Sequence, residues 1–149
     1  ANSTLVLDGL ESLCGHKVAV EKGTTEETDA KAQAAVCTKK GTGKVTVLTF
    51  TNQSQANLAV SSGRADAGFA DSQVAGYIVA NSKGVFQLSG SPFNLAPYGL
   101  ALPKGNGMAP AVLAALQTLI KNGVYTQILT KWGVQSGAIT TPVINGATS

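Results

Sequence analysis

The sequence has little charge and few aromatic side chains. Charged residues make up 13% of the 149 positions and aromatic residues 5%, against 44% hydrophobic residues. Disordered chains combine high charge with few apolar groups, so this composition excludes disorder and indicates a soluble globular protein. At this length the chain can bury one real core, but it is short for two ordinary domains. We therefore expect one compact α/β unit.

Concentrated positive charge and long apolar runs are also missing. The net charge is +3, and the single local group, Lys39, Lys40 and Lys44, has no aromatic residue within it. We expect no nucleic-acid partner, and the three lysines fit a solvated helix end. The most apolar stretch, 108–120, is interrupted by Gln117 and is too short to cross a bilayer. No signal peptide is recognisable, so an exported protein would be represented here in a mature or shortened form.

The chain contains two cysteines, Cys14 and Cys37, and one histidine, His16. Their spacing matches no metal motif, which would need a CxxC pair or nearby histidines. We therefore predict no metal site and no cofactor. A disulfide in an oxidising compartment is the preferred interpretation of the cysteines, and two buried free thiols are the alternative.

Strands and helices alternate along most of the chain. The expected strands are 17–20, 45–50, 67–70, 85–88 and 98–102, and the expected helices are one that begins at Thr24, 54–62, 72–81, 109–122 and 124–132. This alternation predicts an α/β fold with a doubly wound, mostly parallel sheet.

The first helix follows the strand 17–20 and opens with a capping box, formed by Thr24 and by Glu27 three positions later. We expect it to run back antiparallel to the strand for about twelve residues, or about 18 Å. That return would bring Cys37 beside Cys14. The disulfide would then close a loop and stabilise the fold by about 3 kcal/mol in the chain-entropy model.

Two loops carry the candidate functional residues, because ligands of open α/β sheets bind at the carboxyl ends of the strands. Gly23, Thr24 and Thr25 lie at a helix N-terminus, where backbone N–H groups and the helix dipole favour an anion such as a carboxylate. Asp71 follows the strand 67–70, and its carboxylate suits an ammonium group. The alternatives are a plain helix cap in the first loop and an N-cap role for Asp71 in the second.

Four segments of the sequence also resemble a known family. In chain order they are GHKVAVEKGTTEE, SSGRADAGFADSQVAGY, YGLALPKGN and LIKNGVYTQILTKWGV. Together they resemble the polar amino-acid-binding proteins of bacterial ABC importers, solute-binding protein family 3. The resemblance implies the periplasmic binding protein type 2 fold, with residues 1–97 as the second lobe and 98–149 as a strand and helices that return to the first lobe. The first lobe does not precede this sequence, so we expect the chain to be a truncated form.

The resemblance also implies roles for individual residues. The loop of Gly23, Thr24 and Thr25 would bind the carboxylate of an amino acid, and Asp71 would bind its α-ammonium group. Glu26 stands where many relatives carry glutamine beside the ligand, which adds it to the expected ligand-binding residues.

The resemblance does not supply a role in binding for Arg64. This single arginine precedes the strand 67–70 and cannot be the carboxylate-clamping arginine of the family's first lobe. We expect a surface ion pair between Arg64 and Asp66, which would contribute little free energy.

The predicted function is that of a substrate-binding component of an amino-acid ABC importer, with a small α-amino acid and, in the full-length protein, the importer's permease as partners. The implied location is extracellular or periplasmic, and a lipid anchor at the cell surface is compatible with it. The apolar side chains of residues 98–132 would lack the first lobe, which predicts self-association of the fragment through this segment.

Two other functions stay open at this point. One is a dehydratase-like enzyme on the same fold with Glu26 or Asp71 as general acid, although the sequence offers no nucleophile–base pair and we predict no catalytic residue. The other is the extracellular ligand-binding module of a sensory receptor.

Overall fold

A computed structural model of the protein describes residues 3–146 and divides the chain after Phe93 into two compact units. The sequence predicted a division after residue 97. The two units are described separately below.

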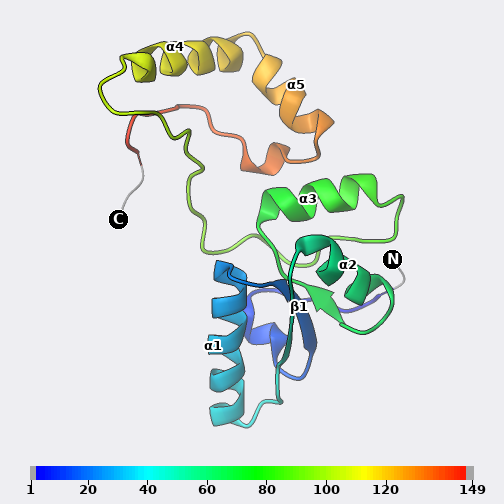
Figure 1. Ribbon diagram of the computed structural model, residues 1–149. Coiled ribbons are helices and arrows are strands. Elements are labelled where there is room, and N and C mark those ends of the chain that lie inside the picture. The colour runs from blue at the N-terminus through cyan, green and yellow to red at the C-terminus, as the bar shows by residue number, and fades with distance from the viewer. Residues whose placement is uncertain (1–2, 147–149) are drawn as a thin grey trace. The chain divides into compact units, whose positions relative to one another are not determined.

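The first unit is built on a sheet of parallel strands in the order β2-β1-β3 (Figure 1). These strands are β1 (Lys17–Glu21), β2 (Thr46–Phe50) and β3 (Ala67–Gly68). The central position of β1 agrees with its sequence, because its middle residues Val18, Ala19 and Val20 are all apolar and all fully buried.

Helices cover both faces of this sheet. Helix α1 (Thr25–Lys40) lies along one face and helix α2 (Gln53–Ser61) along the other (Figure 1). Side chains alternate between the faces of a strand, so Val18 and Val20 pack on the α1 side while Ala19 packs on the α2 side. The predicted doubly wound parallel arrangement is therefore confirmed.

The two faces have cores of different composition. The α1 side contains Leu13, Val18, Val20, Ala30, Cys37 and Val45, and the α2 side contains Ala19, Ala56, Ala59 and Ala65. The small alanine side chains let the backbone of α2 approach the sheet closely, since protein interiors are packed without voids.

The predicted disulfide is confirmed. Cys14 follows the short 3₁₀-helix η1 (Leu10–Leu13), and it is bonded to Cys37 on α1, with 5.6 Å between the two Cα atoms. Helix α1 is longer than the expected twelve residues and continues to Lys40, where Gly41 ends it in a left-handed conformation. The bridge therefore joins η1 to the carboxyl-terminal part of α1.

Helix α3 (Ser72–Asn81) follows β3 and has the predicted bounds. The predicted strand 85–88 is wrong. Here the chain lies beside residues 3–8 and is held by bonds that involve side chains, among them Leu7 N–H to Ser89 Oγ at 2.7 Å. These bonds replace the backbone ladder that a strand requires.

The second unit contains α4 (Met108–Lys121), α5 (Val124–Lys131) and a short 3₁₀-helix, η2 (Gln135–Gly137). The boundary between α4 and α5 lies at Gly123, as predicted, with a φ of 79°. The predicted strand 98–102 is wrong, because the segment has no strand within the described part of its unit to pair with.

The second unit has almost no core of its own. Among its described residues, 94–146, Pro142 alone is buried. Large apolar side chains are instead exposed, including Leu100 at 71% and Ile128 at 46%. Within residues 3–146, none of the helices has the length and apolar character needed to cross a membrane.

Candidate functional site

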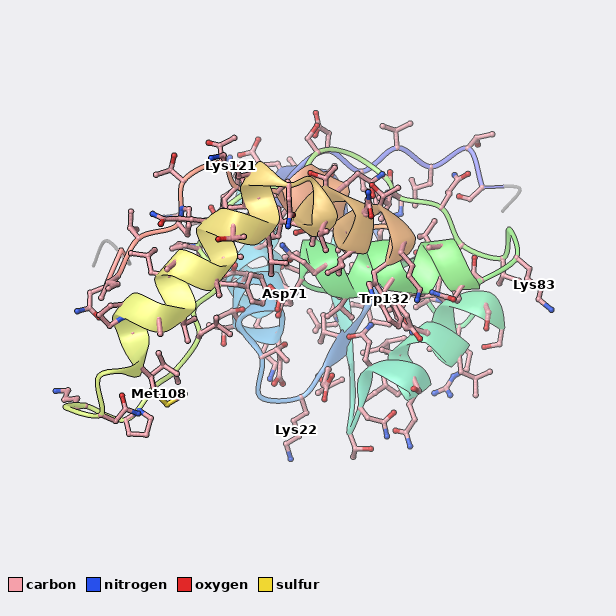
Figure 2. The ribbon with its side chains drawn as sticks, turned by 90° about the horizontal axis from the view of Figure 1, so that it is seen from above. Lys22, Asp71, Lys83, Met108, Lys121 and Trp132 are labelled. Atoms are coloured by element: carbon pink, nitrogen blue, oxygen red, sulfur yellow. A yellow bond between two sulfur atoms is a disulfide. The ribbon has the colours of Figure 1, made fainter. Side chains whose placement is uncertain are left out.

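Three loops of the first unit meet at one edge of the sheet, because parallel strands place their carboxyl ends together. The register pairs Glu21, the last residue of β1, with Phe50, the last residue of β2, and pairs Ala19 with Gly68 on β3. The loop after β1 and the loop after β3 therefore share an edge, as the sequence predicted. Figure 2 shows Lys22 projecting from the first loop and Asp71 at the start of α3.

Gly23 shapes the first loop. Its φ is 81°, in the left-handed region that favours glycine. Its N–H group donates to Glu27 Oε2 at 2.7 Å. The protein itself thus uses this amide, and the structure assigns Gly23 a conformational role in the predicted carboxylate-binding loop.

Thr24 is the N-cap of α1. Its Oγ1 accepts from the N–H of Glu27 at 3.2 Å and donates to the carbonyl of Glu21 at 2.9 Å. The first of these bonds is half of the predicted capping box. The other half is displaced by one residue, because the Glu27 carboxylate accepts from Gly23 and not from the Thr24 N–H.

Three successive N–H groups at the start of α1 are not used by the described protein. Among residues 3–146, the backbone N–H groups of Thr24, Thr25 and Glu26 have no hydrogen-bond acceptor. They lie at the positive end of the helix dipole. A small anion such as a carboxylate could accept from them.

The side chains of Thr25 and Glu26 bond to each other at this helix start, with Thr25 Oγ1 donating to Glu26 Oε2 at 3.3 Å. Thr25 is exposed and Glu26 is half-buried. The Glu26 carboxylate keeps further acceptor capacity, so it can also receive a hydrogen bond from a ligand.

Asp71 occupies the N-cap position of α3, but its side chain makes no capping hydrogen bond. Its carboxylate is exposed and has no ion-pair partner within residues 3–146. The alternative in which Asp71 caps α3 is therefore wrong for its side chain, and the carboxylate is available to a cation.

The expected pair between Arg64 and Asp66 is wrong. The Arg64 guanidinium lies over the ring of Phe50, 5.6 Å from its centroid. Asp66 Oδ2 accepts from the N–H of Lys17 at 2.7 Å and lies 3.7 Å from Nδ1 of His16. Asp66 therefore contacts residues at the amino-terminal end of β1, and Arg64 makes a cation–π contact with Phe50.

Sequence reasoning missed the full role of Glu27. Besides Gly23, its carboxylate accepts from Lys31 Nζ at 2.5 Å and from Thr49 Oγ1 at 3.4 Å. A glutamate at the third helical position signals a capping box, and Lys31 four residues later signals an ion pair, but the contact with β2 needs the folded chain.

The bonds to Glu27 have an electrostatic consequence. The hydrogen bond from Lys31 lowers the pKa of the Glu27 carboxyl most, and the hydrogen bond from the Gly23 N–H is the second-largest cause. A lowered folded-state pKa contributes stability above the unfolded-state pKa and loses it as pH falls through the folded-state value. Glu27 is therefore an anion at neutral pH.

The loop after β2 is occupied with its own helix. Asn52 caps α2 by accepting from the N–H of Gln55 at 3.0 Å, and Thr51 Oγ1 donates to Gln55 Oε1 at 2.9 Å. This loop shares the edge of the sheet with the other two, but its polar groups are bonded within the first turns of α2.

The chain has the α/β fold of the type 2 periplasmic binding proteins. Solved structures support this assignment. An ancestral arginine-binding protein bound to arginine matches with a TM-score of 0.61 and 35% identity, over 85% of this chain and 54% of that one. The ancestral amino acid-binding protein AncCDT-1, a precursor of cyclohexadienyl dehydratase, matches with a TM-score of 0.64 and 32% identity, over 89% of this chain and 53% of that one.

Two curated relatives make the resemblance more specific. The arginine-binding protein ArgT of Corynebacterium glutamicum is 36% identical over 136 residues, which are 91% of this chain and 45% of the relative. The ABC transporter glutamine-binding protein GlnH of Bacillus subtilis is 33% identical over 119 residues, or 79% of this chain and 40% of the relative.

These homologues are amino-acid-binding proteins, as the sequence predicted, and the chain spans less than half of their length. No protein-family model matches the chain.

Proposed function

We propose that this chain forms one wall of the ligand cleft in the substrate-binding component of an amino-acid ABC importer. The observation that carries the proposal is the pairing of two complementary groups at one edge of the sheet. The N–H groups of Thr24, Thr25 and Glu26 lie at the start of α1 and have no acceptor within residues 3–146. The carboxylate of Asp71 follows β3 and makes no capping hydrogen bond to α3. An α-amino acid carries the matching charges on adjacent groups.

The residues have distinct roles in this proposal. The N–H groups of Thr24, Thr25 and Glu26 bind the ligand's carboxylate, and Gly23 gives their loop its shape. Asp71 binds the α-ammonium group. The Glu26 side chain contributes to the choice of ligand, since its carboxylate retains acceptor capacity beside this helix start. The relatives are named as binding proteins for arginine and for glutamine, which supports a polar amino acid as the ligand.

The second unit belongs to another part of the complete protein in this proposal. Residues 98–149 return to a first lobe that supplies the opposite wall of the cleft. The nearly coreless second unit supports this, because its exposed apolar side chains need a partner surface. Without that lobe, the segment 98–132 associates with a second copy.

The proposed location is outside the cytoplasm, where the importer's permease would receive the loaded protein. The Cys14–Cys37 disulfide supports an oxidising compartment.

Binding without catalysis is part of the proposal. The competing function is a dehydratase-like enzyme, favoured by the similarity to the precursor of cyclohexadienyl dehydratase. In that case Glu26 or Asp71 would act as general acid, and turnover of a cyclohexadienyl substrate would be detected. We expect no turnover.

Titration calorimetry with the proteinogenic amino acids tests the proposed function. The product of the complete reading frame should bind one polar amino acid tightly, whereas the 149-residue chain alone should bind it weakly. Affinity comes from burying the zwitterion between two walls, and one wall must compete with water. Absence of binding by the complete protein to every amino acid would contradict the proposal.

A further inference from the structure

Glu27 connects three elements at the candidate carboxylate site. Its Oε2 accepts from the N–H of Gly23 in the loop after β1, and its Oε1 accepts from Lys31 on α1 and from Thr49 on β2. The side chain of Glu27 is 13% exposed, and the three hydrogen bonds that it accepts lie near the protein surface. The carboxylate therefore ties the loop to the helix and to the sheet.

These bonds fix the loop through groups of the protein itself. Gly23 is held by the Glu27 side chain, and the Thr24 hydroxyl is held between the Glu27 N–H and the carbonyl of Glu21. The next N–H groups, which have no acceptor within residues 3–146, are therefore held in place by bonds within the protein. Such preorganisation lowers the entropic cost of binding.

The charge of Glu27 would by itself oppose an incoming carboxylate. Lys31 offsets it, because its ammonium group contacts the same oxygen that accepts from Thr49. The positive end of the α1 dipole acts in the same direction. Glu27 can thus hold the loop with little repulsion of an anion.

We propose that Glu27 is a positioning residue for the ligand's carboxylate, acting through its hydrogen bond to the Gly23 N–H and not through its charge. This inference rests on the proposed amino-acid-binding function. Glu27 touches the loop that binds the ligand but does not itself donate to the ligand.

Two conservative substitutions separate reach from charge. Glu27→Gln keeps an oxygen within reach of Gly23 and removes the charge, whereas Glu27→Asp keeps the charge and shortens the side chain by one methylene group. In the complete protein, Glu27→Asp should weaken binding of L-arginine or L-glutamine by about tenfold, and Glu27→Gln by about threefold or less. Glu11→Ala is the matched control, because it removes an exposed ion pair of 3.0 Å to Lys40 at the other end of α1.

A second readout needs no ligand. In the 149-residue chain, amide hydrogen exchange followed by NMR should accelerate at Gly23 in Glu27→Asp, while Glu27→Gln and Glu11→Ala should keep it slow. The inference is overturned if exchange at Gly23 is unchanged in Glu27→Asp. It is also overturned if Glu27→Gln loses affinity for the amino acid while Glu27→Asp keeps it. If the wild-type complete protein binds no amino acid, the proposed function fails and the positioning role fails with it. If the wild type binds and Glu27→Asp binds equally well, the positioning role fails alone.

Discussion

At the scale of single residues, Asp71 has the most direct role in the proposed function, because its carboxylate makes no capping hydrogen bond to α3. Asp71→Asn in the complete protein should cost about 2–4 kcal/mol of binding free energy, because it removes the proposed charge-assisted contact to the ligand's ammonium group. Asp29→Asn, which changes another carboxylate of the same unit, is the control. Calorimetry measures both, and equal affinity of wild type and Asp71→Asn would contradict the role of Asp71.

Gly90 offers a test of packing at the same scale. Its φ is 70°, and a Cβ added there would lie 2.1 Å from the carbonyl oxygen of Leu7, which is too close for two non-bonded atoms. Gly63 has a similar φ of 73°, and a Cβ there would meet nothing within 4 Å. Gly63→Ala should therefore cost about 1–2 kcal/mol for the left-handed conformation alone.

The clash should make Gly90→Ala cost about 1–3 kcal/mol more than Gly63→Ala. Urea unfolding of both variants measures the difference. Equal losses would mean that residues 3–8 and the segment around Gly90 separate without cost.

Local chemistry explains which residue contacts could be predicted. The Thr24–Glu27 cap was visible because a capping box depends on residues three positions apart. The Arg64–Asp66 pair was wrong because short spacing does not show which distant group competes for each side chain. The Arg64 guanidinium lies over the ring of Phe50, and the Asp66 carboxylate accepts a hydrogen bond from the N–H of Lys17.

At the scale of elements, the disulfide between η1 and α1 should carry much of the first unit's stability. Cys37 is fully buried, and Gln33 Nε2 lies 3.4 Å from its sulfur. Replacing both Cys14 and Cys37 by alanine should lower the free energy of unfolding by about 2–4 kcal/mol. Denaturant unfolding measures this change.

The state of the two thiols is checked independently. Mass spectrometry after alkylation without reductant should find no modified cysteine in freshly purified protein. Two alkylated cysteines would contradict the disulfide and would remove the support it gives to a location outside the cytoplasm.

Helices and paired strands were predictable, and the failures are two strands that find no ladder partner within the described residues. The sequence identified α3 to the residue and placed β1 and β2 within one residue at each end. It failed at 85–88 and 98–102, whose apolar residues resemble strands. A strand exists through its pairing, and the described chain provides these segments with no ladder partner.

At the scale of the whole molecule, the two units differ in whether they bury a hydrophobic core of their own. The first unit buries apolar residues on both faces of its sheet. The second contains two amphipathic helices, yet Pro142 is its single buried residue among 94–146. A unit without a core relies on contacts from outside itself.

This difference predicts self-association of the isolated chain through residues 98–132. Light scattering should give a mass above 15.1 kDa that rises with concentration, because burial of exposed apolar side chains drives association. Ile128→Glu should shift the chain toward the monomer, since it places a charge on an exposed apolar position of α5. Val85→Glu changes a comparably exposed valine of the first unit and should leave the mass unchanged. A strictly monomeric wild type at high concentration would contradict the prediction and would mean that the second unit finds its partner surface within its own chain.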